Sequence, residues 1–315
     1  MAAIVGLWLA MAPATLAQAI APGFSGSYSL NNLGSAAGVP GSYGGLTLLY
    51  NDPNVLLIGG NANGASGGIY AVNLIRGAGN HITGFSGSAT LYATAPNIDG
   101  GLAYGPGNVL FFTRYPSNGI GEIKPGSSSP DKLVTLSGVA SSVGSVAFVP
   151  AGFPGAGTMK IASYSGGGFY EATLTPDGSG TYDVGTGTLQ ATTGSGPEGL
   201  AYIPAGSPLF SNPSMLISEY SGNRVSAYTL DANGAPIPGS RQDFVTGLSG
   251  AEGAFVDPLT GDFLFSTFGS GSQIYSVQGF TAAVPEPGSL LLGLCLTGVG
   301  ATFHALRRRG RGNPA

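Results

Sequence analysis

One short motif recurs along this chain, and its spacing limits the folds that the chain can adopt. The clearest copy runs from Pro197 to Pro204 and reads Pro-Glu-Gly-Leu-Ala-Tyr-Ile-Pro. Related copies run from Tyr43 to Leu48, Asp99 to Tyr104, Val143 to Phe148 and Ala251 to Val256. With positions 45, 101, 145, 199 and 253 aligned, the steps between copies are 56, 44, 54 and 54 residues. Steps of this length are expected when each copy opens one unit of a repeat protein.

The residues after each copy form a similar series of short strands. Three apolar runs, Met215 to Tyr220, Arg224 to Leu230 and Asp243 to Thr246, follow the clearest copy and are separated by Gly, Asn, Asp and Pro. Corresponding second strands are predicted at 109–113, 159–163 and 263–267. Corresponding third strands are predicted at 69–74, 169–174 and 274–277. Four strands per repeat of this length predict an all-β fold, a β-propeller with five blades.

The fifth repeat stops after its third strand, near Phe280. We expect the segment Phe24 to Leu30 to supply the missing strand and close the ring, because an open ring would leave sheet edges exposed. A six-bladed ring is the alternative if 77–97 or 25–40 conceals a degenerate blade. An irregular β-helix or a sandwich is the alternative outside the propellers.

Composition limits the classes of function. Charged residues are only 8% of the chain, aromatic residues are 10%, and there are 56 glycines, which favours apolar strands joined by turns. The segment 20–285 carries 7 basic and 14 acidic residues, so nucleic acid is not an expected partner. The single cysteine, Cys295, lies in a C-terminal apolar run, so the body has no disulfide and no catalytic thiol.

Residues 1–19 are predicted to be a signal peptide. An apolar run from Ile4 to Met11 precedes Ala17-Gln18-Ala19, the small-x-small pattern that signal peptidase reads. No Lys or Arg precedes the run, which departs from the usual pattern. A buried N-terminal helix is the alternative, but Pro13 would interrupt it.

Residues 284–315 contain three features in a fixed order. They are the segment Val284, Pro285, Glu286, Pro287 and Gly288, then the apolar run Leu290 to Leu306, then Arg307, Arg308 and Arg309. This order resembles the PEP-CTERM sorting signal of exopolysaccharide-producing Gram-negative bacteria. The resemblance implies export, transient anchoring in the inner membrane, and cleavage by an exosortase near the Pro-Glu-Pro triplet.

The physical properties of this tail agree with the resemblance. A run of 17 apolar residues is near the lower limit for a transmembrane helix, and the arginine cluster is expected to stay in the cytoplasm. A C-terminal core helix is the alternative, although two prolines separate the run from the repeats. The expected organisation is a signal peptide (1–19), a propeller body (20–283) and a sorting signal (284–315). The mature protein is therefore expected at the cell surface or in the extracellular matrix.

The body itself also resembles a known group. The phrase Gly-Pro-Glu-Gly-Leu-Ala-Tyr, from Gly196 to Tyr202, is similar to the start of inner strands in NHL, gluconolactonase and esterase-like phytase propellers. The phrase opens strands in many unrelated propellers. The resemblance therefore implies the fold and carries no activity.

Three acidic residues are expected at the mouth of the central channel. The loop that leads into an inner strand and the loop that leaves the second strand emerge on the same face, which places Asp99, Glu198 and Glu252 around the axis. Three carboxylates could hold Ca²⁺, which prefers several oxygen ligands. The simpler interpretation, which the sequence favours, is that they accept hydrogen bonds from nearby backbone amides.

Six further residues form the candidate ligand-binding face around that mouth. They are Arg114, Tyr115, Tyr164, Glu219, Tyr220 and Phe268. Packing between blades is the favoured role of the aromatic members, and a sugar-stacking platform is the alternative. His81, the only imidazole in the body, is expected in a surface loop, so clustered histidines cannot supply a metal site.

No convergent catalytic set is evident in the sequence. The leading hypothesis is therefore an exported, non-catalytic propeller that binds carbohydrate or protein in the cell envelope or biofilm matrix. The alternative is a Ca²⁺-dependent hydrolase of lactonase or phosphoesterase type that uses Asp99, Glu198 and Glu252. Ice binding is a remote alternative, because the sequence lacks a regular threonine-bearing face.

Overall fold

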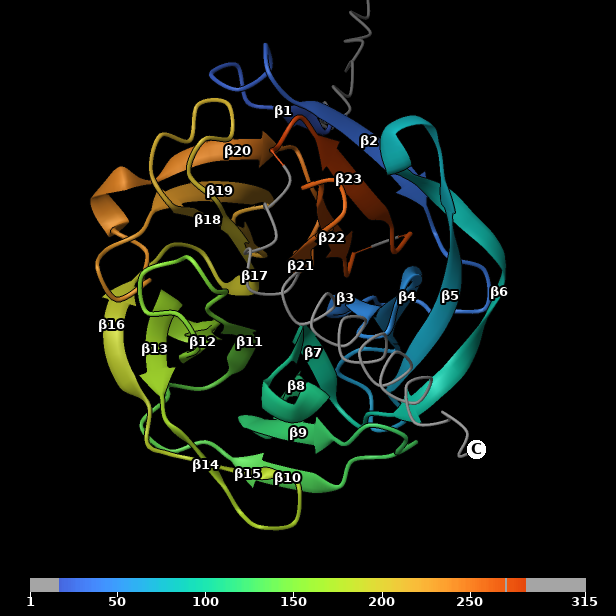
Figure 1. The fold of residues 1–315 in the computed structure, drawn as a ribbon, viewed down its shortest axis with the longest axis vertical. Helices are drawn as coiled ribbons and strands as arrows, with labels where there is room; N and C mark the ends of the chain where they lie inside the picture. The colour runs from blue at the N-terminus through green and yellow to red at the C-terminus, as the bar shows by residue number, and fades with distance from the viewer. Residues whose placement is uncertain (1–16, 270, 282–315) are drawn as a thin grey trace, which may run out of the picture.

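Five antiparallel sheets are arranged around one central axis (Figure 1). The computed structural model describes residues 17–269 and 271–281, and all further structural statements concern these residues. Each sheet is one blade, and β3, β7, β11, β17 and β21 are the strands nearest the axis. The prediction of an all-β, five-bladed propeller is confirmed. None of the helical segments in this part of the chain is long and apolar enough to cross a membrane.

In blades 1 to 3 the strands run outward from the axis in chain order. Blade 1 consists of β3 (Leu46–Leu49), β4 (Asp52–Gly60), β5 (Gly68–Arg76) and β6 (Ile82–Thr94). Blade 2 consists of β7 (Ile98–Tyr104), β8 (Leu110–Arg114), β9 (Gly119–Ile123) and β10 (Lys132–Thr135). Blade 3 consists of β11 (Val143–Phe148), β12 (Met159–Ser163), β13 (Gly168–Ala172) and β16 (Thr188–Thr192), with a hairpin of β14 (Leu174–Pro176) and β15 (Tyr182–Val184).

Blades 4 and 5 take strands from the N-terminal end of the chain. Blade 4 consists of β17 (Pro197–Ile203), β18 (Ser214–Glu219), β19 (Arg224–Thr229) and β20 (Gln242–Thr246), with β1 (Ala19–Ile20) on its outer edge. Blade 5 consists of β21 (Ala251–Val256), β22 (Phe263–Thr267), β23 (Ile274–Gln278) and β2 (Ser29–Gly34). The short 3₁₀ helices are η1 (Ala78–Asn80), η2 (Pro106–Asn108), η3 (Ser165–Gly167) and η4 (Pro238–Ser240).

The ring closes through β2, which pairs with β23 in the register Leu30 to Val277. The predicted closing strand, Phe24 to Leu30, was therefore placed too early. Phe24 lies in a turn and Tyr28 directly follows that turn, and their rings pack with Phe210, Phe244 and Phe280 in an apolar cluster. The six-bladed alternative is wrong, because the stretch 77–97 mainly forms β6, the fourth strand of blade 1, and the stretch 25–40 contains β2.

The apolar core is divided among the five contacts between neighbouring blades. Leu216 packs toward blade 5 while its neighbour Ile217 packs toward blade 3, so both faces of β18 are buried. Likewise Phe111 faces blade 3 and Phe112 faces blade 1. Strands that are buried on both faces read as continuous apolar runs rather than as alternating patterns. This explains why the second strands were the easiest to predict.

The inner strands approach one another so closely at the axis that a side chain does not fit at four of the five aligned positions, the fifth being Ser145. A Cβ on Gly45 would lie 2.6 Å from the Leu102 Cβ, and a Cβ on Gly199 would lie 2.3 Å from the Glu252 carbonyl oxygen. A Cβ on Gly253 would lie 2.5 Å from the Cα of Gly45. Glycine is needed at these positions because only its backbone can pass so close to another backbone. The glycine found in four of the five motif copies thus marks positions of close backbone approach at the axis.

An ion pair and a side-chain hydrogen bond link blades 1 and 5 at the turn between β21 and β22. Arg76 Nη1 lies 2.6 Å from Asp257 Oδ2, and His81 Nδ1 lies 2.7 Å from Asp262 Oδ2. Both aspartate side chains are fully buried. His81 lies in the loop between β5 and β6, as predicted, and its ring contacts a buried carboxylate. These contacts reinforce the closure that β2 makes at the ring's outer edge.

We predict that Gly45→Ala lowers the free energy of unfolding by about 1–3 kcal/mol, because the added methyl group overpacks the axis. Gly84→Ala in β6 is the matched control, since a Cβ there meets nothing within 4 Å. Chemical denaturation monitored by circular dichroism measures both. Equal stability of the two variants would contradict this account of the axis.

Candidate cation site at the channel mouth

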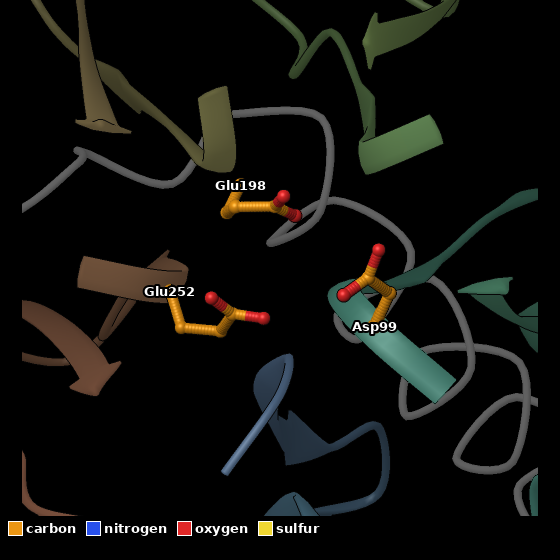
Figure 2. Close-up of side chains that lie close together, drawn as sticks. All are labelled: Asp99, Glu198 and Glu252. Carbon is orange, nitrogen blue, oxygen red and sulfur yellow. The ribbon is translucent and has the colours of Figure 1, made fainter. Parts of the chain in front are cut away.

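Three carboxylates converge where the inner strands begin. Asp99 lies in β7, Glu198 in β17 and Glu252 in β21, and their side chains point toward one another across the axis (Figure 2). One oxygen from each lies within 4.8 Å of the other two. The residues are only 3%, 5% and 1% exposed, respectively. The sequence predicts that these three side chains meet at the channel mouth, and the structure shows them there.

Glycines in the other blades make room for these side chains. Glu198 and Glu252 each stand directly before the axial glycine of their blade, and the equivalent residues of blades 1 to 3 are glycines. In blade 3 this residue is Gly144, where a Cβ would lie 2.6 Å from Glu198 Oε2. In blade 2 it is Gly100, where a Cβ would lie 2.2 Å from the Glu198 carbonyl oxygen. Two glutamates therefore share a space that five side chains could not occupy.

A cavity of about 190 Å³ opens above the carboxylates. Its lining consists of Asn63, Asp99, Tyr115, Ser142, Tyr164, Glu198, Tyr220 and Glu252. Among these side chains there is no lysine, arginine or histidine. The cavity is therefore acidic at its base and aromatic along its wall.

Several oxygens in this cavity are buried without a partner. Glu198 Oε2, Glu252 Oε2 and Asn63 Oδ1 make no hydrogen bond within the described part of the chain. The sequence-based preference for backbone amides as partners of the acids is thus wrong for these two glutamate oxygens. A buried, unpaired polar atom costs about 1–3 kcal/mol, and more if it is charged. The arrangement suits a positively charged ligand that would satisfy all three.

Burial also shifts the acid–base properties of the cluster. Burial raises the pKa of Asp99 to about 7. Hydrogen bonds with Glu252, Gly100 and Asn63 lower this pKa but do not cancel the effect of burial. The pKa of Glu198 is raised well above its ordinary value, first by burial and then by the negative charges of Asp99 and Glu252. Burial, followed by the charge of Asp99, raises the pKa of Glu252 in the same direction. All three shifts favour the protonated carboxyl groups, and a bound cation would oppose these shifts.

Half of the predicted ligand-binding face lines the cavity. The three members that line it are Tyr115, Tyr164 and Tyr220. Tyr115 is 42% exposed. The ring of Tyr220 packs edge-to-face on Tyr164 at 5.9 Å and on Phe268 at 6.0 Å between ring centroids. The prediction of packing between blades is confirmed for these three rings. Tyr115 has no aromatic partner in the described part of the chain.

Arg114, Glu219 and Phe268 were predicted on this face but do not line the cavity. The carboxylate of Glu219 is fully buried in ion pairs with Arg224 and Arg241, each at 2.9 Å. Arg114 Nε donates a hydrogen bond to the Pro96 carbonyl oxygen at 3.2 Å. Glu219 was misplaced because alternate residues of a strand point to opposite faces, and the pairing of β18 with β19 directs it toward Arg224.

Asn63 and Ser142 are cavity residues that the sequence analysis missed. Asn63 has a φ of 64° in the turn between β4 and β5, a conformation that favours asparagine or glycine. The segment Asn61-Ala62-Asn63-Gly64 signals such a turn, but it does not show that the amide reaches the axis. Ser142 directly precedes β11 in a serine pair that has no functional signature.

No protein-family model matches the sequence, and no curated protein matches it. A comparison with solved structures finds distant similarities. An aldose sugar dehydrogenase from Streptomyces coelicolor, in its PQQ-bound form, is 16% identical, with 78% of this chain and 83% of that chain covered and a TM-score of 0.42. A protein described as glucose dehydrogenase is 12% identical, with coverages of 81% and 100% and a TM-score of 0.47. A streptogramin B lyase is 12% identical, with coverages of 80% and 97% and a TM-score of 0.40. These similarities concern the fold alone.

The raised pKa of Asp99 predicts a pH dependence of stability. Its carboxyl ionises near 3.8 when unfolded and at about 7 when folded, so between these values the folded state binds more protons. Stability therefore falls as pH rises through this window. Without divalent cations, we expect a higher unfolding midpoint at pH 5 than at pH 8, and a smaller difference in Asp99→Asn. Each kcal/mol of change in the free energy of unfolding corresponds to a shift of roughly 2–4 °C in the unfolding midpoint. An unchanged difference in the variant would contradict this assignment.

Proposed function

We propose that this protein is an exported, non-catalytic β-propeller whose channel mouth binds a divalent cation, and that the protein captures a carbohydrate or protein of the cell envelope or biofilm matrix. The observation that carries this proposal is the convergence of three buried carboxylates, two of them with unpaired oxygens, in an otherwise aromatic cavity. A cation would offset their mutual repulsion and satisfy those oxygens. Without one, burial and mutual repulsion favour the protonated carboxyl groups.

Ca²⁺ suits this set of donors better than other metals. It takes six to eight oxygen ligands at about 2.3–2.6 Å, in flexible geometry. Asp99, Glu198 and Glu252 offer up to six oxygens, and Asn63 offers an amide oxygen. Two oxygens on opposite sides of a Ca²⁺ lie about 5 Å apart by these distances, comparable to the 4.8 Å limit seen here. The lining has no histidine or cysteine, the ligands that zinc prefers.

Calorimetry on the purified protein tests the metal directly. We expect Ca²⁺ to bind near neutral pH and to raise the unfolding midpoint, and Glu198→Gln or Glu252→Gln to weaken binding at least tenfold. Asp52→Asn, at the first residue of β4, is the charge-matched control. No heat of binding in the wild-type protein, together with an unfolding midpoint that chelator does not change, would refute the metal assignment.

One observation favours a second function, a Ca²⁺-dependent hydrolase. The carboxyl of Asp99 has a pKa of about 7, which suits a group that exchanges protons during catalysis near neutral pH. Assays of lactone and phosphoester hydrolysis with and without Ca²⁺ separate the two functions. Turnover that disappears in Asp99→Asn would replace the non-catalytic proposal.

The export route is part of the same proposal. The segments that suggest signal peptidase, exosortase and transient membrane anchoring lie largely or wholly outside the described residues. In a host that has the exosortase, mass spectrometry of the exported protein should find a C-terminus near Pro285-Glu286-Pro287. Glu286→Ala should retain the apolar run, and the body should fold in both proteins. A wild-type product that still ends at Ala315 would contradict this route.

A further inference from the structure

We infer that the three carboxylates at the channel mouth also accept a primary ammonium group, and that the captured ligand is a lysine side chain of a partner polypeptide. This inference shares the carboxylate site of the proposed function but does not depend on its metal. It names the chemistry by which a matrix protein would be recognised.

The spacing of the carboxylates can accommodate a primary ammonium. Such a group has three N–H donors, and charge-assisted N–H···O contacts are about 2.7–2.9 Å long. With tetrahedral geometry at nitrogen, three acceptors at that distance are roughly 4.6 Å apart. Here one oxygen from each of Asp99, Glu198 and Glu252 lies within 4.8 Å of the others. Each donor can therefore meet a different carboxylate, and Glu198 Oε2 and Glu252 Oε2 are free to accept.

The wall of the cavity suits the stem of a lysine side chain. Tyr115, Tyr164 and Tyr220 surround carboxylates that are almost fully buried, so a ligand must reach them through an aromatic collar. Lysine buries its methylene stem against apolar surface, and a cation is attracted to aromatic ring faces. The cavity of about 190 Å³ is smaller than the roughly 300–1,000 Å³ typical of drug-sized ligands. Its size therefore suits a group smaller than a drug molecule, such as one extended side chain.

The same chemistry occurs elsewhere in this protein. Lys132 Nζ lies 2.8 Å from Asp177 Oδ2 and 2.6 Å from Asp183 Oδ1, and thereby joins β10 to the β14–β15 hairpin. There the chain supplies its own ammonium to an acidic pair. At the channel mouth the lining contains acids and no basic side chain.

Binding of a labelled peptide to the purified full chain tests the inference. The probe is a short uncharged peptide with one lysine, compared with the same peptide acetylated at Nζ. We expect the free lysine to bind at least tenfold more tightly, and Glu252→Gln to remove this preference while Asp52→Asn keeps it. Glu198→Gln is the second variant, and thermal unfolding confirms that each variant folds. Equal binding of both peptides, or an unchanged preference in both glutamine variants, would overturn the inference.

Competition experiments distinguish a lysine ligand from recognition by the aromatic rings alone, from an amino sugar and from Ca²⁺. Tetramethylammonium has no N–H donor and should compete at least tenfold less well than methylamine; equal competition would place recognition on the rings and overturn the role of the carboxylates. Glucosamine that competes as well as the lysine peptide would make the ligand a glycan and overturn the lysine assignment. Ca²⁺ should displace the peptide. If the peptide binds and Ca²⁺ does not, the metal assignment fails alone, whereas Ca²⁺ binding without peptide binding refutes this inference alone.

Discussion

The close approach of five inner strands at one axis is the constraint on which the rest of the structure depends. Backbone atoms of neighbouring blades come within van der Waals contact there, so Gly45, Gly199 and Gly253 cannot carry a side chain. Packing further out is then fixed, because each blade must bury one face against each neighbour. Closure through β2 completes the last sheet and removes its free edge.

The acidic site is a consequence of the same constraint. Where the axis is narrow, a side chain placed just above it is shielded from water and lies close to its counterparts from other blades. Glu198 and Glu252 occupy that level, and Gly100 and Gly144 leave space beside Glu198. Asp99 reaches the level from one residue earlier in its own strand. The fold therefore gathers like charges at a cost in stability, which a bound cation would offset.

Much of the fold could be predicted because the sequence repeats and its strands are buried on both faces. β12 and β22 begin and end at the predicted residues, since continuous apolar runs bounded by turns mark such strands. β2 was placed too early because Phe24 and Tyr28 have strand-like propensity but pack their rings in an apolar cluster before the strand begins. Asp99, Glu198 and Glu252 were found from their places in the motif. Asn63 and Ser142 were not, because loop geometry brings them to the cavity, and Glu219 was misassigned because its ion pairs depend on strand pairing.

The central claim is that the channel mouth is built to hold positive charge, and anomalous X-ray scattering tests it most directly. Crystals grown with Mn²⁺ in place of Ca²⁺ should show one strong anomalous peak at the axis, coordinated by oxygens of Asp99, Glu198 and Glu252. The lysine peptide should remove that peak and place its nitrogen at the same point. Crystals with no density between the three side chains in either experiment, and with the carboxyl groups bonded only to one another, would contradict the account.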